Sequence, residues 1–230
     1  MSLKKRYCLF VCGLFFLSLG IGLIIKSSLG TSPISSIPYI FSFRYPLTLG
    51  MFTFIVNMIF LLLQVLILRR RFEYIQLWQI PMTVIFSCFI DFVMFALEGL
   101  HPVFYAMKIM VLLLGCLSLG MGVALQIIGN VVMLAGEGLV YAIIKKWNLG
   151  LARTKTFFDI SLVVIAVISS LFYFNEIRGI REGTLISSFI VGMIVRFFMQ
   201  TFSIVDEKKN LIFHFPFTFR FIENIVHKKI

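Results

Sequence analysis

Five ionisable side chains stand inside apolar stretches of the sequence, where a charge is costly. Glu137 lies between two glycines, and Asp159 follows Lys155 by four residues, which places both on one helix face. Asp91 and Arg196 lie well inside two other apolar runs. At the centre of a membrane helix, an Arg, Lys or Asp costs roughly 2.5–3.5 kcal/mol unless it is paired or hydrated. These residues are therefore candidates for binding a solute or for pairing with one another.

Backbone groups form a second kind of candidate. Ser32-Pro33 is typical of a helix start, with Ser at the N-cap and Pro at the first helical position, and Gly30 just before permits a tight turn. A helix start carries partial positive charge and suits an anionic or dipolar group. In the second half of the chain, Asn130 offers a side-chain amide at a similar place. The alternative is that Gly and Pro only interrupt a long apolar run.

Each candidate has a functional and a structural interpretation. Glu137 and Asp159 would supply charge to a site, whereas Lys155 is also explained as a cation retained at the cytoplasmic end of its span. Asp91 and Arg196 hold corresponding places in the two halves, so we expect a structural ion pair between them. No nucleophile–base pair, phosphate-binding loop or dinucleotide fingerprint is present, and the Cys and His residues are scattered. We expect no catalytic residue, no metal and no cofactor.

The composition indicates that most of this chain is surrounded by lipid. Of 230 residues 60% are hydrophobic and 13% charged, and the mean hydropathy is +1.02. A soluble domain carries about twice that share of charge, so aqueous enzymes and nucleic-acid-binding domains are excluded. The net charge of +11 is explained by basic cytoplasmic loops. The chain is predicted to be an all-α polytopic membrane protein, with the lipid bilayer as its partner and no nucleic acid.

Six apolar runs have about the length that spans a bilayer. These runs are Tyr7–Ile25, Thr48–Leu68, Trp78–Leu97, Val103–Ile128, Thr154–Phe174 and Thr184–Ser203. Two shorter pieces, 32–43 and 131–144, would rise only about 20 Å as helices, short of the ~30 Å hydrocarbon core. We expect them to be re-entrant or broken helices, and short tilted spans are the alternative.

Loop charges favour the re-entrant arrangement. With six spans, Arg69–Arg71 and Lys145–Lys146 fall on the same side as the N-terminal Lys4-Lys5-Arg6, as the positive-inside rule requires. If the short pieces span instead, Arg69–Arg71 move outside. The prediction is a multi-pass protein of the plasma membrane with both termini cytoplasmic.

An internal repeat divides the chain. Leu17-Ser18-Leu19-Gly20-Ile21-Gly22 recurs as Leu117-Ser118-Leu119-Gly120-Met121-Gly122. Residues 1–100 and 101–203 would each hold three spans and one short helix, and an odd number of spans makes the two repeats inverted in topology. Residues 204–230 form an aromatic and basic tail, expected to lie on the cytoplasmic membrane surface or to pack on the bundle.

Several of these segments resemble the YczE/YyaS/YitT group of bacterial integral membrane proteins, and the YczE branch in particular. The resemblance rests on Gly30-Thr31-Ser32-Pro33, Glu137-Gly138-Leu139, Lys145-Lys146, Lys155-Thr156 with Asp159, and Gly183-Thr184-Leu185. The chain departs from the group at Glu137, Lys155 and Asp159, each a conservative exchange, and lacks a proline before the Glu137 segment. The resemblance implies transport or export and nothing more specific.

Taken together, the sequence predicts a small-molecule transporter or channel with a site between the two short helices. The solute would be small and anionic or zwitterionic, and assembly into homo-oligomers is left open. Two alternatives remain. One is the substrate-binding subunit of an ATPase-driven importer, although residues 7–26 lack the alanines by which such subunits dock. The other is a non-transporting membrane scaffold or assembly factor.

Overall fold

The computed structural model describes residues 2–206, which form helices and connecting loops without a strand. The elements are α1 (Leu3–Lys26), α2 (Pro33–Arg44), α3 (Leu49–Leu68), η1 (Arg69–Arg71), η2 (Tyr74–Trp78), α4 (Gln79–Ala96), α5 (Tyr105–Gly129), α6 (Ala135–Trp147), α7 (Leu151–Phe174) and α8 (Glu182–Asp206). The chain divides into residues 1–198, described below, and residues 199–230, of which 199–206 end α8. The rest of the expected surface tail lies outside the described residues.

All eight expected helices are present, and their lengths divide them as the sequence predicts. Six helical segments are long and apolar enough to cross a membrane, which indicates a multi-pass membrane protein. The helices α2 and α6, with 12 and 13 residues, are too short to cross it. Helix α6 begins at Ala135 instead of Val131, because Asn130 ends α5 in the left-handed conformation and Leu134 is still extended.

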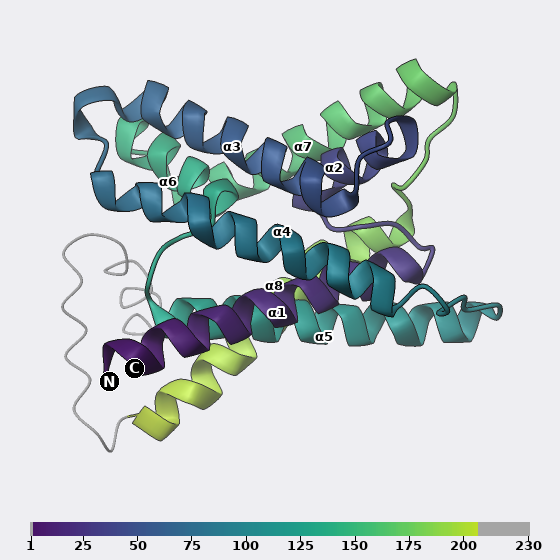
Figure 1. Ribbon diagram of the computed structural model, residues 1–230, viewed down its shortest axis with the longest axis horizontal. Helices are drawn as coiled ribbons and strands as arrows, with labels where there is room; N and C mark the ends of the chain where they lie inside the picture. The colour runs from purple at the N-terminus through teal and green to yellow at the C-terminus, as the bar shows by residue number, and fades with distance from the viewer. Residues whose placement is uncertain (1, 207–230) are drawn as a thin grey trace. The chain divides into compact units, whose positions relative to one another are not determined.

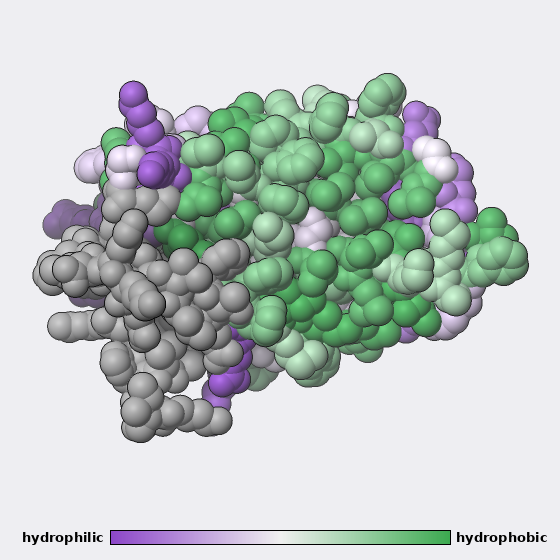
Figure 2. Space-filling model, turned by 90° about the horizontal axis from the view of Figure 1, so that it is seen from below, coloured by the Kyte–Doolittle hydropathy of each residue, from purple (hydrophilic) through white to green (hydrophobic). Residues whose placement is uncertain are grey.

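The molecular surface agrees with burial in lipid. Phe172 is 81% exposed, Phe189 76% and Phe95 75%. Figure 2 shows apolar side chains over the middle of one face and hydrophilic residues near its two ends. Apolar area on this scale is expected of a surface that contacts acyl chains.

The repeated Leu-Ser-Leu-Gly segments form the contact between α1 and α5, which run antiparallel side by side (Figure 1). A Cβ atom on Gly20 would lie 2.5 Å from the backbone nitrogen of Leu119, and one on Gly122 would lie 2.5 Å from that of Leu17. Ser118 Oγ donates to the carbonyl oxygen of Phe16 at 2.9 Å. Small residues thus let the two backbones touch, as they do in many membrane helix pairs.

Two buried clusters hold the helices together. The first contains Phe10, Leu14, Ile24, Leu112 and Cys116, all on α1 and α5, together with residues of α4. The second joins α3, α6 and α7 through Val56, Phe60, Ala135, Leu139 and Leu162. Helix α3 packs on α6, and α2 packs on α7 (Figure 1). The short helices are therefore held between long ones.

Side-chain contacts show which loops share an end of the helices. Lys145 Nζ lies 3.1 Å from Glu73 Oε1, which places the end of α6 beside the loop that follows Arg69–Arg71. We call this the triple-arginine end. At the opposite end, Lys26 donates to the carbonyl oxygen of Glu98. Both α2 and α6 begin between the two ends, and α2 runs toward the opposite end while α6 runs toward the triple-arginine end (Figure 1).

Candidate functional site

The segment that leads into α2 is tied to the start of α8. Gly183 N donates to Leu29 O at 2.8 Å, and Thr31 N donates to Thr184 Oγ1 at 3.2 Å. Gly30 has a φ of +126°, and a Cβ atom there would collide with Thr184 Oγ1. The tight turn expected at Gly30 is therefore present, and only glycine fits it without strain. The turn fixes where α2 can begin.

The first turn of α2 is lined by buried hydroxyl groups. Ser32 occupies the N-cap position and Pro33 the first helical position, as predicted, but the Ser32 hydroxyl makes no capping hydrogen bond. It donates instead to Ser35 Oγ at 2.9 Å. The neighbouring Thr31 hydroxyl is buried, and no partner for it is seen among the described residues. The first N–H groups of a helix have no acceptor within the helix, so this start offers donors as well as hydroxyls.

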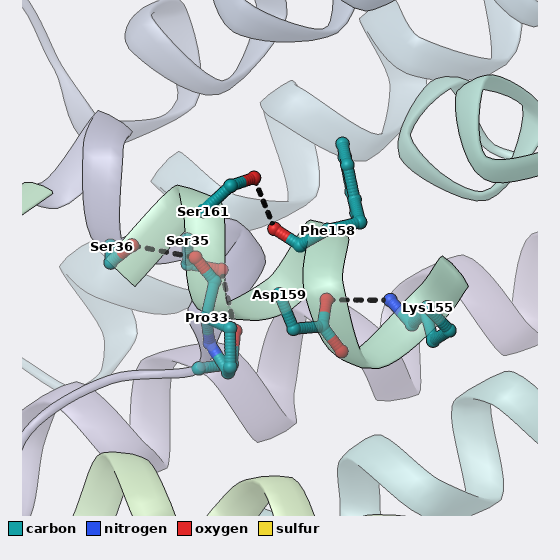
Figure 3. A network of polar contacts seen from close by, with 8 residues as sticks. Pro33, Ser35, Ser36, Lys155, Phe158, Asp159 and Ser161 are labelled. Atoms are coloured by element: carbon teal, nitrogen blue, oxygen red, sulfur yellow. Dashed lines mark hydrogen bonds and ion pairs between the residues drawn. The ribbon is translucent and has the colours of Figure 1, made fainter. Parts of the chain in front are cut away.

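Lys155 and Asp159 lie beside this helix start. The Lys155 ammonium is 2.9 Å from Asp159 Oδ1, one turn along α7, which confirms that they share a helix face. Figure 3 shows Asp159 next to Pro33 and Lys155 on the far side of Asp159, consistent with the packing of α2 on α7. Asp159 is 26% exposed and Lys155 40%, so both retain some contact with their surroundings. Lys155 also lies 5.7 Å from the centre of the Phe158 ring.

Helix α6 brings Glu137 to the same place. A Cβ atom on Gly136 would collide with the Ile34 side chain, so the first turns of α2 and α6 touch. Glu137, next in sequence, is half-buried in the first turn of α6, where the charges of Lys155 and Asp159 both act on it. Neither a hydrogen bond nor an ion pair to Glu137 is seen within residues 2–206. The first turns of α2 and α6 thus lie together, with Asp159 of α7 next to Pro33. We call the first turns of α2 and α6, with Lys155 and Asp159, the polar junction.

An amide pair that the sequence does not reveal positions the start of α6. Gln64 Nε2 donates to Ala135 O at 2.9 Å, and the amides of Gln64 and Gln79 exchange hydrogen bonds at 3.2 Å. Both glutamines are almost fully buried. Gly138 gives Gln64 room, since a Cβ there would lie 2.7 Å from Gln64 Oε1. Gln64 is visible in the sequence as an amide in an apolar run, which by itself indicates only contact between helices.

Asn130 has a different place from the one expected. Its φ of 45° ends α5, and its carbonyl oxygen and that of Gly129 both accept hydrogen bonds from the Arg6 guanidinium. A cation at a helix C-terminus is favourable, because the last carbonyls carry partial negative charge. No hydrogen bond of the Asn130 side-chain amide is seen among the residues described. In this structure Asn130 ends α5 and supplies a backbone carbonyl to Arg6.

The expected ion pair between Asp91 and Arg196 is not formed. Asp91 Oδ2 accepts from Thr48 Oγ1 at 2.7 Å and Oδ1 accepts from Gly50 N at 2.8 Å, whereas Arg196 is exposed on α8. The prediction was wrong because the start of α3 already offers Asp91 two donors and a favourable helix dipole. A Cβ on Gly50 would clash with Asp91, so glycine is what permits this contact.

An open groove of about 590 Å³ lies between the end of α6 and the start of α7. It reaches Phe158 and Ser161, on the same stretch of α7 as the polar junction, but neither Ser32 nor Glu137 lines it. This groove therefore does not extend to the first turns of α2 and α6. Among residues 2–206 no three His, Cys, Asp or Glu side chains come together as metal ligands.

The junction combines groups of opposite character. Two carboxylates, one ammonium, several hydroxyls and two helix starts can hold a small dipolar molecule, and the carboxylates can exchange protons.

The fold and the junction belong to an all-helical, multi-pass membrane protein with two short internal helices. Within that class, the chain belongs to a family described as a family of unknown function (DUF6198), whose sequence pattern matches residues 4–200. No significant match is found among the curated proteins or the solved structures. The family description does not mention the YczE/YyaS/YitT group, so that resemblance stays a prediction.

Proposed function

We propose that this chain is a small-molecule transporter or channel whose solute binds at the polar junction. The proposal depends on one observation above all: the first turns of α2 and α6 touch through Ile34 and Gly136, beside the Lys155–Asp159 pair and Glu137. Helices that begin inside a membrane protein are found where ions and polar solutes cross. The resemblance to the YczE/YyaS/YitT group leads to the same proposal.

Inverted repeats would explain how such a site could open to either side. The contacts are reciprocal, because α2 of the first half packs on α7 of the second, and α6 of the second packs on α3 of the first. The antiparallel contact of α1 with α5 joins the first half to the second, and the two short helices run toward opposite ends (Figure 1). Rocking of one repeat against the other is the usual basis of alternating access.

The charges suggest the kind of solute. A helix start favours an anionic group, whereas Glu137 and Asp159 favour a cationic one, and Lys155 balances only one of the two carboxylates. A zwitterionic or anionic molecule fits this combination. By the positive-inside rule, the triple-arginine end and both termini would be cytoplasmic and the membrane the plasma membrane.

Accessibility of the junction tests the proposal without knowledge of the solute. In a variant free of native cysteines, Ser32→Cys is treated with a charged, membrane-impermeant thiol reagent in right-side-out and inside-out vesicles. Alternating access predicts labelling from both sides, because Ser32 lies where the two short helices begin. Ser18→Cys, a fully buried serine in the contact of α1 with α4, is the control and should stay unlabelled.

A second candidate is a non-transporting membrane scaffold, which is favoured by the observation that the groove between α6 and α7 reaches neither Ser32 nor Glu137. If Ser32→Cys is unlabelled from both sides, the transport proposal fails and the scaffold is favoured. Labelling from one side only would indicate a vestibule and contradict alternating access. The importer-subunit alternative gains no support, because the small residues of α1 already pack against α5 and are not free for a partner.

A further inference from the structure

The groove between α6 and α7 is lined by the loop that joins them and the first turn of α7, which we call its mouth, and by the next turns of α7. Arg153 and Thr154 lie in the first turn of α7, and Phe157, Phe158 and Ser161 follow in the next turns. Arg153, Phe157 and Ser161 are four residues apart and so form one stripe along the helix. The stripe is about 12 Å long at 1.5 Å per residue. Because Arg153 is basic and Phe157 is aromatic, the stripe matches a ligand with one charged and one apolar part.

The groove lies at the boundary of the membrane-spanning region. Helix α7 begins at Leu151 and is apolar enough to cross the membrane, so Arg153 lies in the first turn of that span. Trp147, in the last turn of α6, is 57% exposed, and tryptophan is enriched at the level of the lipid headgroups. The mouth of the groove is therefore placed at headgroup level, with Phe157 and Ser161 nearer the acyl chains.

The mouth carries positive charge that the described residues do not neutralise. Arg153 is exposed, and within residues 2–206 no carboxylate forms an ion pair with it. Lys146, also exposed, precedes the groove by a few residues, whereas Lys145 is paired with Glu73. An anionic headgroup would supply the missing counter-charge, and each basic residue near a membrane surface attracts anionic lipid.

We propose that this groove binds one phospholipid with an anionic headgroup, its phosphate at Arg153 and an acyl chain along Phe157 and Ser161. The groove has the size of a small-molecule site, for which 300–1,000 Å³ is usual. This binding goes beyond the proposed function, because it requires neither transport nor an open junction.

Titration of the purified full chain with lipid tests the proposal. The protein, in an uncharged detergent, is titrated with phosphatidylglycerol or phosphatidylcholine, and bound lipid is counted by native mass spectrometry. Arg153→Gln should weaken phosphatidylglycerol binding about fivefold, which corresponds to the ~1 kcal/mol expected of one basic residue. Arg70→Gln, the same change of charge at the exposed triple arginine, should leave that binding unchanged.

A steric variant gives an independent test of the same site. A Cβ on Gly150, which lines the mouth, would meet nothing within 4 Å, so Gly150→Leu adds bulk at the mouth without a clash. It should reduce the binding of both lipids. Gly99→Leu, where a Cβ also meets open space, is the matched control and should not reduce binding.

Either of two results would overturn the proposal. One is that Arg153→Gln and Arg70→Gln lose phosphatidylglycerol binding equally, which would indicate general attraction to a basic surface. The other is unchanged binding in Gly150→Leu. Thermal unfolding of each variant verifies that the fold is kept, and because no transport is measured, neither result depends on the transport proposal.

Discussion

At the scale of single residues, Glu137 carries the strongest functional expectation. It is half-buried, adjacent to the contact between the two short helices, and exposed to the charges of Lys155 and Asp159. Glu137→Gln keeps the shape and removes the charge. We expect cells that overproduce this variant to lose the uptake of labelled anionic or zwitterionic solutes that the wild type confers, with normal expression. Glu98→Gln, at an exposed position, should retain uptake, and full-rate uptake by Glu137→Gln would show that the residue only packs.

Gly30 makes a prediction about stability. Its φ of +126° and its contact with Thr184 exclude a side chain, so Gly30→Ala should destabilise the protein by about 1–3 kcal/mol. The comparison is Gly99→Ala, where a Cβ meets open space and the change should stay within about 0.5 kcal/mol. Both are measured by thermal unfolding in detergent. Equal unfolding temperatures for the two variants would contradict a requirement for glycine at position 30.

At the scale of elements, Asp91 joins α4 to the start of α3. Asp91→Ala leaves Thr48 Oγ1 and Gly50 N without their acceptor and should cost about 1–3 kcal/mol. Arg196→Gln should not destabilise the protein, because the exposed side chain lies on an apolar helix, where an unpaired charge is costly. In a double-mutant cycle the two effects should add, since the residues do not touch. A coupling energy well above 0.5 kcal/mol would instead support the ion pair predicted from the sequence.

In the pair α1 and α5, the two copies of the repeated sequence pack against each other. Gly20 and Gly122 come from the two copies of the Leu-Ser-Leu-Gly segment, and each lies against the backbone of the other helix. A larger residue at either place must push the helices apart. The repeat therefore has a direct structural reason, close packing of two backbones, whichever function the junction performs.

At the scale of the whole molecule, the topology can be tested. The contact of Glu73 with Lys145 puts the loop after Arg69–Arg71 and the end of α6 at one end, which the positive-inside rule predicts to be cytoplasmic. We expect Arg70→Cys to be labelled only in inside-out vesicles and Gly99→Cys only in right-side-out ones. Labelling of Arg70→Cys from outside intact cells would reject the six-span topology and the inverted repeats with it.

The sequence alone determined the features that depend on local composition. The lengths of the apolar runs predict six long helices and two short ones, and the spacing of Lys155 and Asp159 predicts one helix face. Ser32-Pro33 marks the start of α2 for an equally local reason, because Pro fits the first helical position. These features need no knowledge of which helix packs on which.

Only the tertiary structure decided the long-range partners. In it Ile34 contacts Gly136, and Gln64 is hydrogen-bonded to Gln79 and Ala135. Asp91 is bonded to the start of α3 instead of to Arg196. The physical reason is the solvent. In lipid both the buried and the exposed faces of a helix are apolar, so the hydrophobic pattern that reveals the inner face of a soluble helix is absent. The choice of partner is then made by close packing and by a few buried hydrogen bonds, which a single sequence does not display.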